Sequence, residues 1–107
     1  MPDARMIEED GVVAVVRLDD LSAAAPLAEA LAGGGVRSIE FTYTNPAAGE
    51  AIAAARAALG ERAFIGAGSV LDPETARAAI LAGAAYVVTP TLSLRTIELC
   101  HRYGVPT

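Results

Sequence analysis

Short runs of β-branched and other apolar residues alternate along the chain with longer amphipathic segments. The apolar runs begin near residues 12, 37, 63 and 85, at intervals of about 25 residues. The first, Val12 to Val16, is an unbroken run of the kind that is buried on both faces of a parallel sheet. Short loops join each run to the next amphipathic segment, so the pattern predicts repeated strand–helix units with parallel strands and right-handed crossovers.

Capping residues set the expected limits of the elements. Strands are expected over residues 12–17, 36–43, 63–66 and 85–89, with the start of a fifth at 105–107. Helices are expected over residues 3–10, 22–32, 46–59, 72–83 and 93–104. The expected N-caps are Asp19, Asp20 or Ser22 for the second helix, Asn45 for the third, Asp72 for the fourth and Ser93 for the fifth. Glycines follow the last four of these helices, as is typical of C-terminal stops.

Two α/β architectures fit this order: half of a (β/α)8 TIM barrel, with about four strand–helix units, or a small open doubly wound sheet. The helix faces do not separate them, whereas the residues at the strand ends favour the half-barrel. The 107 residues suffice for one small domain, which we expect to span residues 1–107.

Composition narrows the range of partners and compartments. The net charge of −5, without a run of like charges, argues against nucleic acid or an anionic membrane as a partner. No apolar run approaches the roughly 20 residues of a membrane span, and the acidic N-terminus does not resemble a signal peptide. A single cysteine, Cys100, excludes an internal disulfide and fits a reducing, cytoplasmic location. Cys100 and the neighbouring His101 lack the partners that a metal site requires.

The chain contains no lysine, because all eight of its basic residues are arginines. A mechanism that needs a side-chain amine, such as a Schiff base, therefore cannot run on these residues alone.

Polar residues and glycines gather where the expected strands end. Arg17 follows the first, Glu40, Thr42 and Thr44 the second, Gly66 to Ser69 the third, and Thr89, Pro90 and Thr91 the fourth. In both architectures these ends share one rim, where function concentrates. Such a set suits a small anionic substrate: Arg17 can pair with a carboxylate, Ser69 and its loop amides can donate to it, and Glu40 can move a proton.

Each of these residues also has a purely structural explanation. Glu40 could point to water or pair with a nearby arginine, and Arg17 could be a solvated residue at a strand end. The Gly66-x-Gly68 spacing is not a dinucleotide fingerprint, because Leu71 occupies the third glycine position, and its glycines could simply permit a tight turn. Pro90 could simply shape its loop.

Four separated stretches, in order, resemble the 2-keto-3-deoxy-6-phosphogluconate / 4-hydroxy-2-oxoglutarate aldolases, which are class I aldolases with a (β/α)8 barrel. They are Val12–Arg17, Gly34–Thr42, Ile65–Leu71 and Val87–Pro90. The resemblance implies that Glu40 is the proton-shuttling glutamate and that Ser69 replaces a threonine that helps bind the pyruvyl carboxylate. It also implies that Arg17, Gly68 and Pro90 line the pocket. Thr44 is expected to bind substrate as well: it departs from members with a carboxylate-binding arginine at this place, whereas other members have a threonine there.

The same resemblance places the Schiff-base lysine on the sixth strand and the phosphate site in the last loops, both beyond Thr107. It implies a substrate that is a small 2-oxo acid or a sugar-acid phosphate, no cofactor, and a homo-oligomer, commonly a trimer in full-length members. Asn45-Pro46 is similar to 2-dehydro-3-deoxy-6-phosphogalactonate aldolases, so the sugar configuration stays open. Three hypotheses follow: the N-terminal part of an aldolase, an inactive half-barrel that only associates, and a binder of small 2-oxo acids.

Overall fold

A computed structural model describes residues 2–107 and contains a three-stranded parallel sheet. The strands are β1 (Ala14–Val16), β2 (Ser38–Thr42) and β3 (Phe64–Gly68), in the order β1-β2-β3. Val15 pairs with Glu40 across the first ladder, and Glu40 pairs with Gly66 across the second. All three strands therefore end at one rim, as the sequence pattern predicts.

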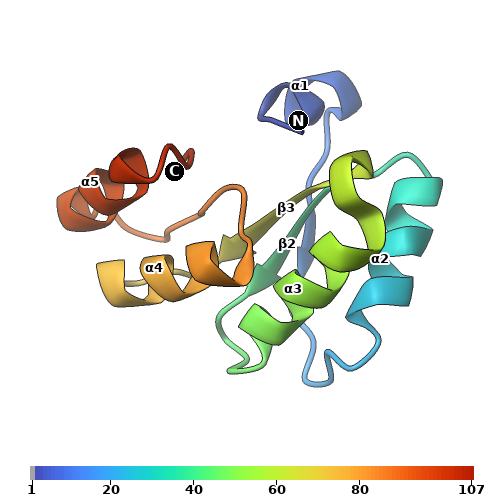
Figure 1. Cartoon of the computed structure of the whole chain (residues 1–107), viewed down its shortest axis with the longest axis horizontal. Coiled ribbons are helices and arrows are strands. Elements are labelled where there is room, and N and C mark those ends of the chain that lie inside the picture. The colour runs from blue at the N-terminus through green and yellow to red at the C-terminus, as the bar shows by residue number, and fades with distance from the viewer. Residues whose placement is uncertain (1) are drawn as a thin grey trace.

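The helices are α1 (Arg5–Asp10), α2 (Ala24–Gly33), α3 (Ala48–Leu59), α4 (Pro73–Ala82) and α5 (Leu94–Arg102), with a 3-10 turn, η1 (Gly60–Arg62), after α3. Four of the helices, α2 to α5, lie side by side along the sheet, and α1 lies at one end of it. Figure 1 shows α2, α3, α4 and α5 succeeding one another from right to left, and each contacts the next. A doubly wound sheet would carry helices on both faces, so this arrangement is that of a half-barrel.

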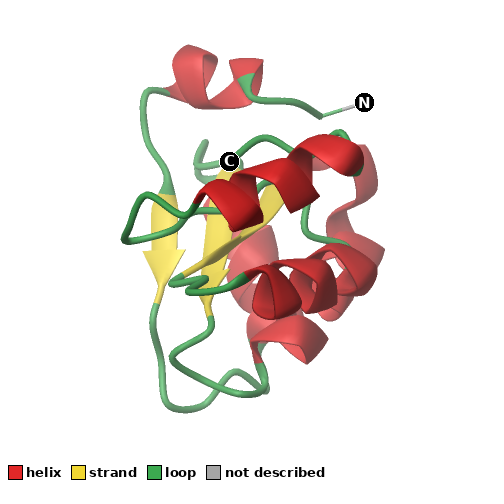
Figure 2. Cartoon of the chain, turned by 90° about the vertical axis from the view of Figure 1, so that its left-hand side faces the viewer, coloured by secondary structure: helices red, strands yellow, loops and turns green. Residues whose placement is uncertain are grey.

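The hydrophobic core lies between the sheet and these helices. Ile39 and Phe41 of β2 and Ile65 of β3 are fully buried on the side that faces the helices. Many of the helical core positions are alanines, among them Ala28 and Ala55, which allow close approach of backbones. Figure 2 shows the strands beside these helices, with α1 above the ends at which the strands begin.

Helix α1 is fastened to the sheet by charge pairs. Arg37, just before β2, donates to Asp10 at 2.6 Å and to Glu9 at 2.9 Å. The guanidinium of Arg37 lowers the pKa of Asp10 below its ordinary value, so the pair persists at neutral pH. This contact closes the end of the sheet opposite the rim.

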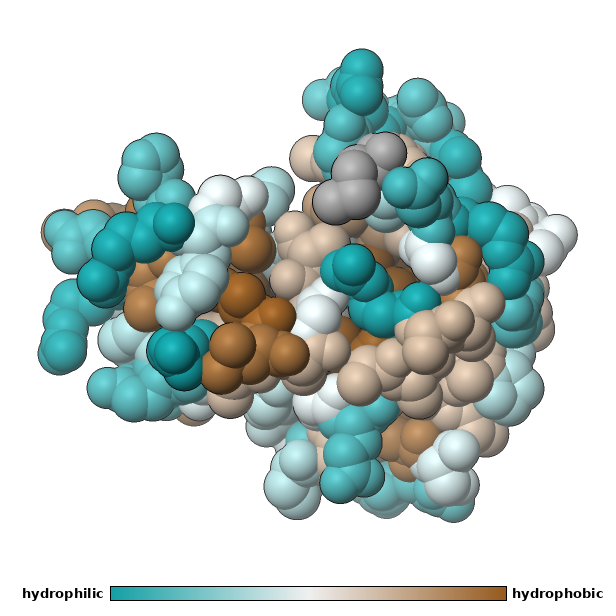
Figure 3. Space-filling view, viewed as in Figure 1, coloured by the Kyte–Doolittle hydropathy of each residue, from teal (hydrophilic) through white to brown (hydrophobic). Residues whose placement is uncertain are grey.

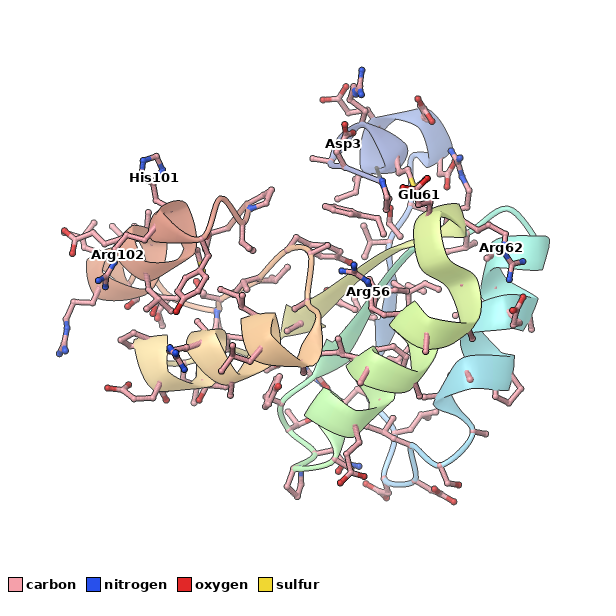
Figure 4. All side chains as sticks on the ribbon, in the orientation of Figure 1. Asp3, Arg56, Glu61, Arg62, His101 and Arg102 are labelled. Atoms are coloured by element: carbon pink, nitrogen blue, oxygen red, sulfur yellow. The ribbon has the colours of Figure 1, made fainter. Side chains whose placement is uncertain are left out.

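Arginines also join neighbouring helical units. Arg56 of α3 points toward the turn that follows α4 and donates to the carbonyl of Gly83, whose φ of 113° favours glycine (Figure 4). Arg62, at the end of η1, donates to Glu29 of α2 at 2.6 Å. These links hold the helices in the order that the sheet imposes.

The fourth strand expected over residues 85–89 is wrong as a regular element. Only an isolated parallel bridge forms, between Ala67 and Val87, although the amide of Val88 donates to Ala67 and that of Val87 donates to Pro106. Ser69 adopts a left-handed φ of 54° directly after β3, which interrupts the regular strand geometry, although the amide of Val70 still donates to the carbonyl of Val88. Pro90 has no N–H with which to extend the pairing. The expected fifth strand is represented only by that contact at Pro106.

Two helix starts also differ from prediction. Helix α2 begins at Ala24 and helix α3 at Ala48, and neither has a side-chain N-cap. Asp20 instead accepts from the amide of Ser22, and Asn45 accepts from the amide of Ala47, so both close turns ahead of the helices. The predicted caps Asp72 and Ser93 are confirmed, because they accept from the amides of Thr75 and Thr96.

On the face shown in Figure 3, brown, hydrophobic atoms gather around α4 and α5. Leu81 of α4, Leu94 of α5 and Leu92 before α5 are exposed. Within residues 2–107, no helix combines the length and apolar character needed to cross a membrane.

Candidate active site

Glu40 lies at the centre of β2, on the face that points away from the helices. Its side chain is 6% exposed, and its Oε2 atom has no hydrogen-bond partner among the described residues. Alternation along the strand puts Ser38 and Thr42 on the same face. A buried carboxylate oxygen without a partner costs folding free energy, so its retention indicates a function beyond stability.

Two glycines of β3 make the space that Glu40 needs. Gly66 and Gly68 lie on the same face as Glu40, and a Cβ atom at Gly68 would collide with the Glu40 carboxylate. A Cβ atom at Gly66 would lie 2.5 Å from the ring of Tyr86. Neither glycine has a positive φ, so the interpretation of this pair as a tight turn is wrong. The glycines form two slots, one for the carboxylate and one for the Tyr86 ring.

Arg17 and Ser69 meet at the rim. Arg17 follows β1 and Ser69 follows β3, and the Nη2 atom of Arg17 donates to the Ser69 hydroxyl at 3.1 Å. Ser69 has a left-handed φ of 54° at this point, directly after β3. Guanidinium and hydroxyl groups so placed can both donate to a carboxylate, because both keep further donor capacity.

Thr42 and Thr44 form a second pair of hydroxyls, 2.8 Å apart. Thr44 is exposed and lines a shallow hollow together with Arg17, Asn45 and Pro46. The amide of Asn45 donates to the carbonyls of Leu18 and Asp19 at 3.1 and 2.9 Å. Asn45 therefore ties the loop after β2 to the loop that carries Arg17.

Burial has the largest effect on the pKa of the Glu40 carboxyl. Loss of solvation raises the pKa of the Glu40 carboxyl above its ordinary value, while the positive charge of Arg17 opposes that shift. A carboxyl with a raised pKa exchanges its proton more readily near neutral pH, as general acid–base chemistry requires.

The predicted site residues do not all converge. The structure brings Glu40 against Gly68 and Arg17 against Ser69, and it places Thr44 on the same rim. Pro90 is exposed in the loop that follows the Val87 bridge, and no hydrogen bond among residues 2–107 joins it to the other site residues.

Sequence reasoning missed two residues at this site. Asn45 is a link between loops rather than a helix cap, and Tyr86 lies beside Glu40 on the inner face. Alternation along residues 85–89 is the signal that could have revealed Tyr86, because it puts Tyr86 and Val88 on the face opposite Val87. No equivalent signal marks Asn45, since both of its carbonyl partners belong to another unit.

The arrangement combines a proton-transfer group with an anion-binding pair. Glu40 can take up or release a proton, and Arg17 with Ser69 can hold a carboxylate beside it. In residues 2–107, no cluster of three or more His, Cys, Asp or Glu side chains is spaced to hold a metal ion. The chemistry that these residues support is therefore proton transfer on a small anionic molecule.

Comparisons with known proteins find matches over almost the whole chain. Residues 4–107 match the family model "KDPG and KHG aldolase". A 2-dehydro-3-deoxy-phosphogluconate aldolase of Treponema pallidum is 42% identical over 100 residues, covering 94% of this chain and 47% of that protein.

Two solved structures share the fold. KDPG aldolase from Legionella pneumophila, with pyruvate captured as a covalent carbinolamine intermediate, superposes with a TM-score of 0.80 at 29% identity, covering 88% of this chain and 45% of that one. The 2-keto-3-deoxy-6-phosphogluconate aldolase of Zymomonas mobilis with 3-phosphoglycerate gives 0.81 at 30% identity, covering 96% and 50%. The chain thus spans about half the length of the relatives that it matches.

Proposed function

The chain belongs to the KDPG and KHG aldolase family, and on that premise we propose that it forms part of an enzyme of aldol cleavage. The proposed substrates are 2-keto-3-deoxy-6-phosphogluconate, 4-hydroxy-2-oxoglutarate or both, and the products are pyruvate and an aldehyde. The observation that carries the proposal is the buried carboxylate of Glu40, which has an unpartnered oxygen and lies within electrostatic range of Arg17, the arginine that pairs with Ser69 at the rim. The Treponema relative, at 42% identity, supports the choice of reaction.

In this proposal Glu40 moves the protons of the reaction. It accepts the proton of the substrate C4 hydroxyl as the C3–C4 bond breaks, and the bonding electrons pass to an iminium at C2. The aldehyde then leaves, and Glu40 returns a proton to C3 of the resulting enamine. Arg17 and Ser69 hold the C1 carboxylate and so orient C3 toward Glu40.

The iminium needs an amine that these residues do not provide. All eight basic residues are arginines, so the 107 residues contain no lysine. The proposal therefore assigns the amine to residues other than these, and assigns the acid–base group and the carboxylate site to this chain. The carbinolamine captured with pyruvate in the Legionella relative supports the involvement of an amine in the reaction.

A chimera tests the proposal. The 100 residues of this chain that align with the Treponema enzyme replace the matching stretch of that enzyme, and release of pyruvate from 2-keto-3-deoxy-6-phosphogluconate is measured. We expect cleavage by the chimera and a loss of at least about 100-fold in kcat when Glu40→Gln is introduced. Glu50→Gln, on the exposed surface of α3, is the matched control and should retain activity. A folded chimera whose kcat is unaffected by Glu40→Gln would contradict the proposal.

A second candidate is binding of a small 2-oxo acid without cleavage. The absence of lysine from the 107 residues favours it, because the Arg17–Ser69 pair could hold a carboxylate without any Schiff base. A chimera that folds and binds pyruvate but cleaves nothing would favour this candidate over the aldolase.

A further inference from the structure

Gly68 is the residue of β3 that limits where the carboxylate of Glu40 can lie. It is buried at the end of the strand, and its backbone does not have the positive φ that would require glycine. A glycine also weakens a strand, because it contributes no side chain to the packing. Neither backbone conformation nor packing explains a glycine here, so the space beside its Cα atom is the feature to explain.

That space is occupied by the Glu40 carboxylate. A Cβ atom at Gly68 would overlap with Oε2 of Glu40 and would lie 3.0 Å from its Cδ atom. The next atom, Cγ2 of Thr42, would be 3.3 Å away, a contact that a shift of a few tenths of an ångström relieves. The severe clash is therefore with the carboxylate alone.

The two carboxylate oxygens of Glu40 differ in their surroundings. The buried side-chain atoms that lack a hydrogen-bond partner within residues 2–107 include Oε2, the oxygen nearest Gly68, but not Oε1. No side-chain hydrogen bond in this part of the chain involves Glu40, so Oε1 is the oxygen that solvent reaches. Charge is disfavoured on an oxygen that has neither water nor a donor beside it. The negative charge, and the proton that replaces it, therefore belong on Oε1.

We propose that Gly68 is a positioning residue that holds Oε2 of Glu40 against β3, so that proton transfer runs through Oε1. The inference rests on the proposed function, because it concerns the group assigned there to proton transfer. The missing Cβ atom admits the carboxylate to the backbone of β3, and fixing Oε2 leaves Oε1 as the oxygen that can reach a substrate. This role differs from lining the substrate pocket, which the family resemblance implies for Gly68.

The first test is Gly68→Ala in the chimera. The new Cβ atom should displace the carboxylate from its reactive position, and we expect kcat to fall by about 100-fold while KM changes less than about threefold. Gly33→Ala is the matched control, because a Cβ atom there meets nothing within 4 Å, and it should leave both constants unchanged. An unchanged kcat, or a loss confined to KM, in folded Gly68→Ala would overturn the proposal.

A second measurement uses the 107-residue chain and needs no reaction. Burial raises the pKa of Glu40 in the parent chain, and Arg17 opposes that shift. In Gly68→Ala the displaced carboxylate regains water, so its pKa, followed by NMR of the side-chain carboxyl carbon, should fall toward the ordinary value of 4.5. An unchanged or raised pKa in the folded variant would overturn the proposal.

A double variant keeps the proposal testable if Gly68→Ala is too unstable to fold. Adding Glu40→Ala removes the carboxylate that the new Cβ atom would strike, so the double variant should fold with a Tm close to that of Glu40→Ala alone. A loss of Tm on Gly68→Ala that is equal with and without Glu40 would overturn the proposal. The proposed function fails by a different result, full cleavage activity in Glu40→Gln, which leaves these pKa and Tm comparisons unaffected.

Discussion

At the scale of single residues, Glu40 is a charge placed where folding does not favour it. Its Oε2 atom is buried without a partner, and Gly68 leaves the space that makes this position sterically possible. Natural proteins keep such groups mainly where they act on a ligand. Glu40 is therefore expected to reduce stability while it serves the reaction.

We predict that Glu40→Gln stabilises the chain at neutral pH. Burial raises the pKa of Glu40 in the folded state above its ordinary value of 4.5. Protonation of Glu40 therefore contributes to the free energy of unfolding in full below pH 4.5, and this contribution is lost as the pH rises through the pKa of the folded state. The variant should therefore raise the Tm by a few degrees at pH 7, and this gain should disappear near pH 4. Thermal unfolding followed by circular dichroism measures both.

A matched variant distinguishes the effect of a buried charge on the Tm from the effect of a charge at the surface. Glu50→Gln removes an exposed glutamate of α3 and should change the Tm little at either pH. A lower Tm for Glu40→Gln than for the parent chain at pH 7 would show that the charge of Glu40 is compensated in the folded protein.

At the scale of elements, sequence pattern predicted the interiors of the strands and helices better than their connections. The Val12–Val16 run and the capped helices after Asp72 and Ser93 depend on local residues, which a sequence displays directly. The positions of Asn45 and Ser69 depend on contacts with other units: Asn45 binds the carbonyls of Leu18 and Asp19, and Ser69 meets Arg17. Such long-range contacts leave no periodicity in the sequence.

We predict that Asn45→Ala loosens the loop that carries Arg17. Asn45 makes two side-chain bonds to that loop and one to the amide of Ala47, so its loss should lower the free energy of unfolding by about 1–3 kcal/mol. Amide shifts of Leu18 and Asp19 should change in the same variant. Urea unfolding and two-dimensional NMR provide these measurements.

Asn45→Asp distinguishes the two roles of Asn45. It keeps an acceptor for the Ala47 amide and loses both donors to the loop, so it should affect Leu18 and Asp19 as strongly as alanine does. If both variants left these amides unchanged, the loop would owe its position to other contacts.

At the scale of the whole molecule, the chain is a half-barrel whose helices cover one face of the sheet. Its other face carries Glu40, Gly66, Gly68 and Tyr86, with Val15 left 55% exposed. The (β/α)8 class was predictable because strict strand–helix alternation and residues at the strand ends both indicate it. The contacts on the inner face, such as that of Glu40 with Gly68, were not predictable, because they depend on the register between neighbouring strands. A functional site therefore emerges only when β1, β2 and β3 are aligned.

The most direct test of this account is a pyruvate titration of the protein, followed by the amide signals of Gly68 and Ser69. If Arg17 and Ser69 hold a carboxylate beside Glu40, both signals should shift saturably, and Arg17→Gln should abolish the shift. Arg102→Gln, on the exposed last turn of α5, is the control and should leave it intact. Amides of Gly68 and Ser69 that stay unchanged at saturating pyruvate, in a folded protein, would contradict the central claim that this rim is a carboxylate site.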